Sequence, residues 1–391
     1  MTERDALIIM NAVPGLGNRR IRKIRDVLGS LRRLFTLRQS ELKGLTRLSD
    51  QLVENIIRFP KEKFLQKEYQ ALKKLHAEII TENDSIYPEI LKQIPDAPIV
   101  LYIRGRMPDC FGNAIAIVGS RKASCYGRIQ AEKIATRLVE SGVMIISGMA
   151  RGIDTAAHRG ALKASGTTVA VLGSGLANIY PPENAGLADE IANHGAVITE
   201  FAIQTLPKPF NFPRRNRIVS GLSAGVLVVE AAAKSGALIT ADYALEQGRD
   251  VYAVPGMIDQ PQSKGVNNLI KQGARLFMGV DDILDEWNTF QSATHADQSG
   301  STVRYTEQHE HSVVAPVVPL KEEERYLLNV FNDAQPLHIE QICMRLDCSL
   351  PVCDVLLLQL EMKGCINQLP GKFFIRRRYK EKACDYTNYV K

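Results

Sequence analysis

The stretch IAIVGSRKASCYGRIQAEKIATRL, residues 115–138, decides the fold that this sequence predicts. An apolar run at 115–118 stops at Gly119-Ser120-Arg121, and a helix-like pattern follows it. A strand, a glycine turn and a helix in this order are typical of units that bind phosphate at the start of the helix. The loop matches neither G-x-G-x-x-G nor G-x-x-x-x-G-K-[ST], the patterns of dinucleotide and nucleoside-triphosphate sites. The stretch therefore predicts a phosphate site of another kind.

The same alternation of apolar runs and helical patterns continues through residues 76–287. The runs are apolar throughout, as expected of strands that are buried on both faces of a sheet. They lie at 115–118, 143–146, 168–172, 196–199, 225–229 and 250–254, and most are separated by helical patterns such as 129–139, 155–163, 187–192 and 238–247. This order predicts an α/β fold, a doubly wound, mostly parallel sheet with helices on both faces.

Residues 1–75 predict an entirely helical segment that is also basic. It contains 17 Lys and Arg against 8 Asp and Glu, a net charge of +9, whereas the whole chain carries +6. The sequence NAVPGLGNRR at 11–20 places a glycine turn between two apolar-periodic segments, with basic residues after it. Such a turn can present backbone N–H groups to a DNA phosphate, or it can be a plain helical hairpin with a solvated basic face. The motif alone leaves both alternatives open.

The C-terminal third predicts a linker and a small domain. Residues 288–319 are rich in Ser, Thr, His, Gln and Asp without periodicity, which is typical of a flexible linker. Residues 320–380 show three short helical patterns and a two-stranded ribbon turning near Pro370, the order of a winged helix. Val352, Val355, Leu356, Leu360 and Met362 are expected to form the core side of its third helix. A winged helix binds DNA or protein, and the fold alone does not decide between them.

Unusual residues gather where the predicted strands end, which is where open parallel sheets bind ligands. Four loops are expected to converge there, including KPFNFPRRNRIVSGLS at 208–223 and the start of EAAAKSGALITA at 230–241. Glycines let an anion approach the backbone, and arginines offer two parallel N–H groups to a phosphodiester. The predicted basic rim consists of Arg121, Lys208, Arg214, Arg215, Arg217 and Lys234. So many charges suit a polyphosphodiester better than one mononucleotide. Phe210, Phe212 and Tyr180 among them are candidates for stacking on the bases of a single strand.

The sequence gives weaker support for a catalytic site or a metal site than for a DNA site. Asp154 and His158 are four residues apart, but the pattern favours Asp154 as a helix N-cap and His158 as a packed side chain. Glu230 at a strand end is a candidate hydrolytic carboxylate, without a convincing second one. No His or Cys cluster has zinc spacing, so no metal and no cofactor are expected. Seven cysteines without a C-x-x-C pair, no signal peptide and no long apolar stretch predict a soluble, cytoplasmic protein without membrane insertion.

Five motif blocks spread over residues 80–280 together resemble the DNA-processing protein A family, DprA, also called Smf. The blocks are VGSRKASCYG, SGMARGIDTAAHRGAL, VLGSGLANIYPPEN, NFPRRNRIVSGLS and KSGALITADYALEQGRDVYAVPG. The resemblance implies an extended Rossmann-like domain that binds single-stranded DNA. It also implies a homodimer through that domain, protection of incoming DNA, and loading of the recombinase RecA during natural transformation. The helical N-terminal part is similar to the sterile-alpha-motif or helix-hairpin-helix domain that some members carry. The C-terminal part is similar to the winged-helix domain of some members.

The resemblance also implies which positions contact DNA. Its Gly-Ser-Arg loop corresponds to Gly119, Ser120 and Arg121. Its FP-x-RNR segment and its Lys-Ser-Gly block, with a less secure basic position before them, correspond to Lys208, Phe212, Pro213, Arg215, Asn216, Arg217, Lys234, Ser235 and Gly236. The prediction is thus a non-enzymatic recombination mediator that binds single-stranded DNA. Two alternatives stay open: a Rossmann-like hydrolase of nucleotide N-glycosidic bonds that uses Glu230, and a scaffold that recruits proteins.

Overall fold

The structure is a computed structural model that describes residues 1–46, 48–285, 322–328, 330–331, 337–346, 350–363, 365–369 and 373–376. The chain divides into two compact units, residues 1–300 and 301–391. The linker predicted at 288–319 lies outside the described residues. The segments predicted as an N-terminal domain and a Rossmann-like domain both belong to the first unit.

The first unit begins with a group of helices, as the sequence predicted for residues 1–75. They are α1 (Glu3–Ala12), α2 (Asn18–Leu28), the 3-10 helix η1 (Leu31–Phe35), α3 (Gln39–Thr46), α4 (Asp50–Arg58) and α5 (Lys61–Leu75). A reciprocal capping box between Thr2 and Asp5 starts α1, and Gly29 in the left-handed conformation (φ 73°) ends α2. Apolar residues of these helices share one buried cluster with strands of the sheet, which joins the helices to the rest of the unit.

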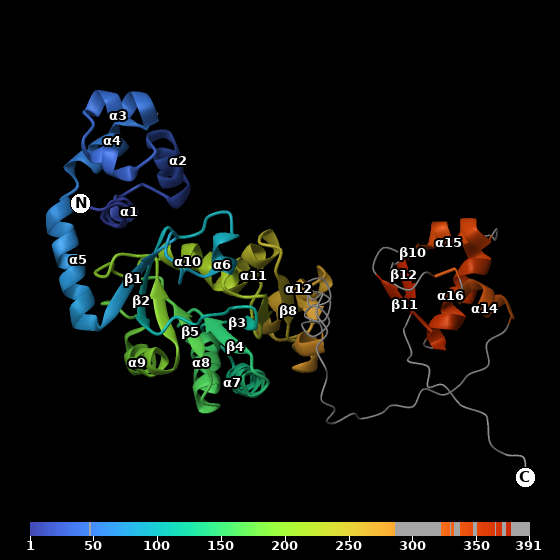
Figure 1. Cartoon of the computed structure of the whole chain (residues 1–391). Coiled ribbons are helices and arrows are strands. Elements are labelled where there is room, and N and C mark those ends of the chain that lie inside the picture. Colours follow the sequence, from blue (N-terminus) through green and yellow to red (C-terminus); the bar gives the residue numbers. More distant parts are fainter. Residues whose placement is uncertain are drawn as a thin grey trace, which may run out of the picture. The chain divides into compact units, whose positions relative to one another are not determined.

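A nine-stranded sheet forms the centre of this unit, in the order β1-β2-β6-β5-β4-β3-β7-β8-β9 (Figure 1). Its strands are β1 (Ala77–Thr81), β2 (Val100–Gly105), β3 (Ala114–Val118), β4 (Met144–Ser147), β5 (Thr168–Val171), β6 (Ala196–Thr199), β7 (Gly225–Val228), β8 (Asp250–Ala253) and β9 (Arg275–Leu276). The six predicted runs are β3 to β8, and all pairs among them are parallel. The sequence missed β1 and β2, which pair antiparallel at one edge, and the two-residue β9.

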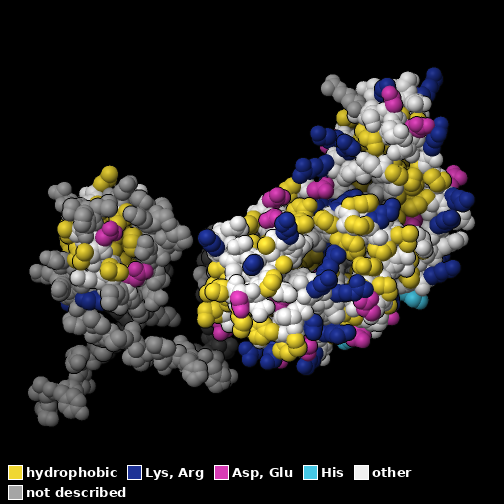
Figure 2. All heavy atoms as spheres, turned by 180° about the vertical axis from the view of Figure 1, so that it is seen from behind, with side chains coloured by type: hydrophobic (Ala, Val, Ile, Leu, Met, Phe, Trp, Pro, Cys, Tyr) yellow, Lys and Arg dark blue, Asp and Glu magenta, His cyan; other side chains and the backbone are white. Residues whose placement is uncertain are grey.

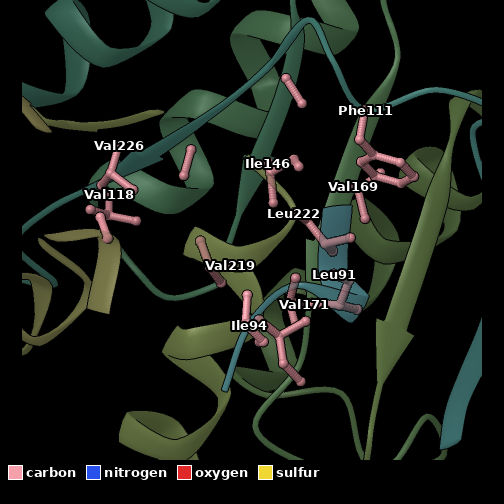
Figure 3. Packing of buried hydrophobic residues seen from close by; sticks show 14 of the residues in the cluster. Leu91, Ile94, Phe111, Val118, Ile146, Val169, Val171, Val219, Leu222 and Val226 are labelled. Carbon is pink, nitrogen blue, oxygen red and sulfur yellow. The ribbon is translucent and has the colours of Figure 1, made fainter. Parts of the chain in front are cut away.

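Helices cover both faces of the sheet, which confirms the doubly wound α/β architecture. One face carries α7 (Cys125–Glu140), α8 (Ile153–Lys163) and α9 (Ala185–His194), and the other carries α6 (Glu89–Lys92), α10 (Asn211–Gly221), α11 (Gly236–Glu246) and α12 (Lys264–Lys271) (Figure 1). Short 3-10 turns, η2 (Pro182–Asn184) and η3 (Pro261–Ser263), precede α9 and α12. Figure 3 shows how Leu91, Ile94, Val219 of α10 and Leu222, which directly follows α10, pack against strand residues such as Val171. This packing holds α10 against that face of the sheet.

The second unit has the winged-helix order that the sequence predicted. Its described elements are α14 (Glu322–Leu328), β10 (Leu337–His338), α15 (Ile339–Leu346), α16 (Leu350–Met362), β11 (Ile366–Leu369) and β12 (Phe373–Arg376), with a sheet in the order β10-β12-β11. The sequence predicted the ribbon of β11 and β12 and missed the two-residue β10, which pairs with β12. The residues in the predicted turn of the ribbon, near 370, lie outside the described part.

The prediction for the core face of α16 was wrong at two positions. Val352 is 52% exposed and Val355 is 55% exposed, whereas Leu360 is fully buried, as expected. The buried stripe of the helix runs instead through Cys353, Leu357 and Leu360, which the helical period places on one face. Val352 and Val355 project from a neighbouring face of the helix. Leu356 is partly buried against this core, and the side chain of Met362 lies outside the description.

Candidate functional site

The Gly119-Ser120-Arg121 loop directly follows β3 and packs backbone to backbone against two neighbouring loops. The Ser120 N–H donates to the Glu230 carbonyl at 2.6 Å, and the Ile153 N–H donates to the Ser120 carbonyl. A Cβ on Gly152 would overlap with that same carbonyl, and Gly152 also has a φ of +78°. Glycine is therefore required where the loops after β3 and β4 meet. The close fit holds the loop in place and leaves the Arg121 side chain exposed.

A hollow of about 510 Å³ lies beside this loop, and we call it the Arg121 pocket. Loops after β3, β4 and β7 line it together with the N-terminal parts of α10 and α11. Of the twelve predicted DNA-binding residues, eight line it: Gly119, Ser120, Arg121, Phe212, Arg215, Asn216, Ser235 and Gly236. Lys234 is exposed and immediately precedes Ser235, whose hydroxyl caps α11 by accepting from the Ala237 N–H. The structure thus brings together residues from segments that are more than a hundred positions apart in sequence.

Cations and aromatic rings alternate from this pocket into a small neighbouring hollow, which Arg121, Phe212, Tyr180 and Arg151 line. The Arg121 guanidinium lies over the Phe212 ring, 5.0 Å from its centroid, and the Phe212 and Tyr180 rings are 5.5 Å apart. Arg151, which the sequence did not single out as a site residue, lies over Tyr180 and pairs with Glu183. Figure 2 shows Lys and Arg side chains interspersed with apolar ones across this unit. Positive charge beside exposed ring faces suits a ligand that has both phosphates and planar bases.

Arg215 forms the floor of the Arg121 pocket rather than its rim. Its side chain is buried and donates to the backbone carbonyls of Gly148 and Val171, and burial lowers its pKa to about 10. Asp154 is also buried and accepts from the Gly148 N–H at 3.2 Å and the Ala150 N–H at 3.3 Å. Asp154 is therefore not the N-cap that the sequence predicted, because Gly152 occupies that position of α8. Burial raises the pKa of Asp154 to about 6, although Arg215 and Arg121 act in the opposite direction.

Arg217 does not lie on the predicted basic rim. Its side chain is only 5% exposed, and its guanidinium pairs with Glu200 at 2.7 Å and with Asp96 at 3.2 Å. The segment predicted as a loop is helix α10 from Asn211 onward, so consecutive side chains point about 100° apart. Helical geometry therefore separates Arg217, buried among carboxylates, from Asn216 in the pocket.

Lys208 and Arg214 line a second hollow of about 440 Å³, which we call the junction groove. One wall comes from residues 200–214, and the other comes from the N-terminal helices, including Pro14, Phe59 and Phe64. Sequence reasoning missed this groove because its two walls are far apart in the chain. The basic segment and its glycine turn were the signals that pointed towards it.

Glu230 and His158, two of the side chains that the sequence offered as catalytic candidates, form hydrogen bonds that hold neighbouring elements together. The Glu230 carboxylate accepts from the backbone N–H of Ser124 at 3.0 Å and from its hydroxyl at 2.6 Å, which ties β7 to the start of α7. Glu230 also lines a separate hollow of about 650 Å³. His158 is fully buried, as the sequence predicted, with Nδ1 2.8 Å from the Thr168 hydroxyl, and burial lowers its pKa to about 3. Among the described residues, no group of His, Cys, Asp and Glu side chains has the arrangement of a metal site.

Known proteins share both the sequence and the architecture. The family model described as DNA recombination-mediator protein A matches residues 78–288, and that of the DprA winged helix domain matches residues 314–372. Protein Smf of Escherichia coli (strain K12) is 38% identical over 338 residues, covering 85% of this chain and 86% of that protein. DNA processing protein DprA of Bacillus subtilis (strain 168) is 44% identical over 201 residues, covering 51% of this chain and 68% of that protein.

A solved structure agrees with these matches. The X-ray structure of DNA processing protein A from Streptococcus pneumoniae superposes with a TM-score of 0.62 at 35% identity, covering 73% of this chain and 98% of that one. The first family model spans more than half of the chain, and the Escherichia coli relative matches it over most of its length. The chain therefore belongs to the DNA recombination-mediator protein A family, that of the DprA and Smf proteins.

Proposed function

We propose that this chain binds single-stranded DNA in the Arg121 pocket and acts as a recombination mediator. The observation that carries the proposal is the Arg121 guanidinium lying over the Phe212 ring in a hollow walled by glycine backbone. Arginine supplies charge for a phosphate, the ring supplies a stacking face for a base, and the capped start of α11 adds a positive helix end. Bases can stack on protein rings when they are unpaired, which favours a single strand over a duplex.

The cellular role is proposed from family membership. We infer that the chain protects incoming DNA and loads RecA onto it during natural transformation, as a cytoplasmic homodimer formed through the Rossmann-like part. Within the described residues, no helix is both long and apolar enough to cross a membrane. Two measurements test these points separately: RecA filament assembly on oligothymidine coated with single-strand-binding protein, and the mass of the chain by sedimentation equilibrium.

We also propose that the chain is not an enzyme. The only carboxylate that the sequence offered for hydrolysis at a strand end, Glu230, is held by two hydrogen bonds from Ser124. Incubation with nucleoside monophosphates, followed by chromatography for free base, tests this directly. Release of base that is lost in Glu230→Gln would contradict the proposal and support the hydrolase alternative.

Fluorescence anisotropy tests the DNA site. Labelled oligothymidine and a duplex of equal length are titrated across a range of salt concentrations with wild type, Arg121→Ala and Arg137→Ala. Arg137 is an exposed arginine near the end of α7 and is the matched control, because it does not line the pocket. We expect single-strand preference and a loss of about tenfold in affinity in Arg121→Ala, with a salt slope smaller by about 0.7 for one lost phosphate contact. Equal binding by Arg121→Ala and Arg137→Ala would overturn the proposal.

A further inference from the structure

Ten of the twelve predicted DNA-binding residues occupy two hollows rather than one. Eight line the Arg121 pocket, but Lys208 and Arg214 line the junction groove. The segment from Phe210 to Phe212 connects them, because Phe210 and Asn211 line the groove while Phe212 lines the pocket. The two hollows are therefore lined by consecutive residues of one segment.

The exposed side chains on this path repeat the chemistry of the pocket. Phe210 is 68% exposed, and the Lys208 ammonium lies 5.9 Å from its ring centroid. The Arg214 guanidinium lies 5.4 Å from the Phe201 ring centroid, and its side chain keeps 38% of its surface exposed. Two further pairs of a cation and an aromatic ring therefore follow the pair of Arg121 and Phe212. Such alternation is what a sugar-phosphate chain with unpaired bases requires.

The one carboxylate in the junction groove does not repel an anion strongly. Glu200 is buried and pairs with both Arg214 and Arg217. Burial alone would raise its pKa, but the two guanidinium groups outweigh burial and hold the pKa below its ordinary value. Glu200 is therefore an ionised group neutralised by two cations, and Lys208 adds positive charge to the groove.

The opposite wall of the groove is held firmly in place. The Asn11 amide at the end of α1 donates to the Glu200 carbonyl at 2.8 Å, and the Ile203 N–H donates to the buried Glu68 carboxylate of α5 at 3.1 Å. At the Pro14-Gly15 turn, the exposed Arg20 donates to the Gly15 carbonyl, which places its guanidinium at this wall. The wall that the N-terminal helices form is thus fixed and lined by uncharged residues, and Arg20 adds a positive charge beside it.

The basic residues of the first two helices fall into two groups. Arg4, Arg22 and Arg25 pair with Asp84 and Glu82, so they join the helices to the rest of the unit. Arg19, Arg20 and Lys23 remain exposed on the helix that follows the turn. Their charge is available to a polyanion, whereas the first three arginines share two carboxylates and are partly neutralised.

We propose that single-stranded DNA leaving the Arg121 pocket runs over Phe210 into the junction groove, where the N-terminal helices form the second part of the binding site. This inference rests on the proposed function and extends it to a part of the chain outside the segment that matches the DNA recombination-mediator family model. The occupant is a nucleic acid strand because the groove continues a proposed DNA path and carries exposed cations beside aromatic rings.

Anisotropy with oligothymidines of about 6 and about 20 nucleotides tests the proposal, since single-strand sites span several nucleotides. The groove variant is Arg20→Ala/Lys208→Ala/Phe210→Ala, in which all three side chains are exposed in the native structure. Its control is Lys73→Ala, an exposed basic residue in the last turn of α5 that does not line the groove. We expect unchanged binding of the short strand and a loss of about tenfold or more on the long strand. The salt slope for the long strand should fall by about 1.4, for two lost phosphate contacts.

The outcomes separate this inference from the proposed function. If Arg121→Ala weakens both strands but the groove variant equals Lys73→Ala on both, the extended path is wrong and the pocket stands. If the groove variant weakens binding of the short and the long strand equally, the groove adds no contact that only a long strand reaches. The extended path is then wrong. If Arg121→Ala binds both strands with the affinity of wild type, the proposed function itself is wrong, whatever the groove variant does. Circular dichroism melting of each variant shows whether the fold is kept.

Discussion

Asp154 and Arg215 lie together beneath the Arg121 pocket, and both bind the backbone of Gly148. The arginine was predicted as a DNA contact, and the structure shows it bonded to the loops that form the pocket floor. A buried guanidinium bonded to carbonyls fixes loop geometry, while the exposed Arg121 stays available to a ligand. At the scale of single residues, the site therefore divides into side chains that hold its shape and side chains that face outward.

Asp154 makes the stability of the fold depend on pH. Its pKa in the folded chain is about 6 against an ordinary value of 3.8, so the folded state holds this proton more tightly than the unfolded state. Stability from this group is therefore fully present at low pH and is lost as pH rises from 3.8 to about 6. The shift corresponds to ~3 kcal/mol. We expect the free energy of unfolding of wild type, relative to Asp154→Asn, to fall by about that amount between about pH 4 and about pH 7.

Urea unfolding of both proteins across this pH range measures the difference. The comparison with Asp154→Asn removes the effect of the other carboxylates, which titrate in both proteins. A constant difference would show that Asp154 titrates in the folded state as it does in the unfolded one. Asparagine keeps an oxygen that can accept from the Gly148 and Ala150 N–H groups, so the loop is expected to survive the change.

At the scale of elements, α10 explains why adjacent arginines have different surroundings. Arg214 lines the junction groove, and Arg215 lies in the floor of the Arg121 pocket. Arg217 is buried and pairs with both Glu200 and Asp96. The sequence predicted the residue types at this edge but could not predict these directions. Pro213 and the run of polar residues concealed the helix, and the partners of Arg217 are distant in the chain.

The buried pair of Arg217 and Glu200 predicts a stability effect without a direct binding effect. Removing one partner of a buried ion pair typically costs ~3–5 kcal/mol, because the other charge stays buried. Because Arg214 still pairs with Glu200 in Arg217→Met, we expect this variant to lower the free energy of unfolding by an amount near the lower end of that range. The double variant Glu200→Gln/Arg217→Met should lose less than the sum of the single variants. Chemical denaturation provides these values, with Arg121→Ala as an exposed arginine expected to change stability by less than about 0.5 kcal/mol.

DNA binding by Arg217→Met shows whether Arg217 only stabilises the fold or also contacts the DNA strand. Since Arg217 lines neither the Arg121 pocket nor the junction groove, folded Arg217→Met should keep the wild-type salt slope. A variant as stable as wild type that has lost DNA affinity would instead show that Arg217 contacts the strand, as the sequence predicted.

The strands of the sheet were predicted from the sequence only in part. The six continuous apolar runs predicted β3 to β8, because parallel strands that are buried on both faces need such runs. The missed β2 follows the same rule, since its residues 100–103 are apolar and buried, so the sequence did carry a signal for it. By contrast, β1 begins with a partly exposed Ala77 and an exposed Glu78, and β9 has only two residues. On α16 the apolar residues Val352 and Val355 are exposed, so hydrophobicity without the helical period placed them wrongly. The convergence of Arg121, Phe212 and Ser235 was predictable because parallel strand ends meet at one edge.

At the scale of the whole molecule, each unit has its own hydrophobic core. The core of the second unit is built from residues such as Leu327, Ile342 and Leu360, and the first unit has three separate buried clusters. The described residues of the Arg121 pocket and of the junction groove all belong to the first unit. A chain that ends at residue 288 should therefore keep both the fold of the first unit and its single-strand site.

We expect this truncated chain to bind oligothymidine within about twofold of the full chain and with the same salt slope, because no phosphate contact is lost. Any affinity for duplex DNA that depends on the winged helix should disappear from the truncated chain. Anisotropy with both nucleic acids on both chains gives the comparison, and Arg121→Ala in the truncated chain is the control for the pocket. Loss of single-strand affinity in a truncated chain that still unfolds cooperatively would place part of the site in the second unit. Unchanged duplex affinity would assign duplex binding to the first unit, and the winged helix would then be left to bind a protein.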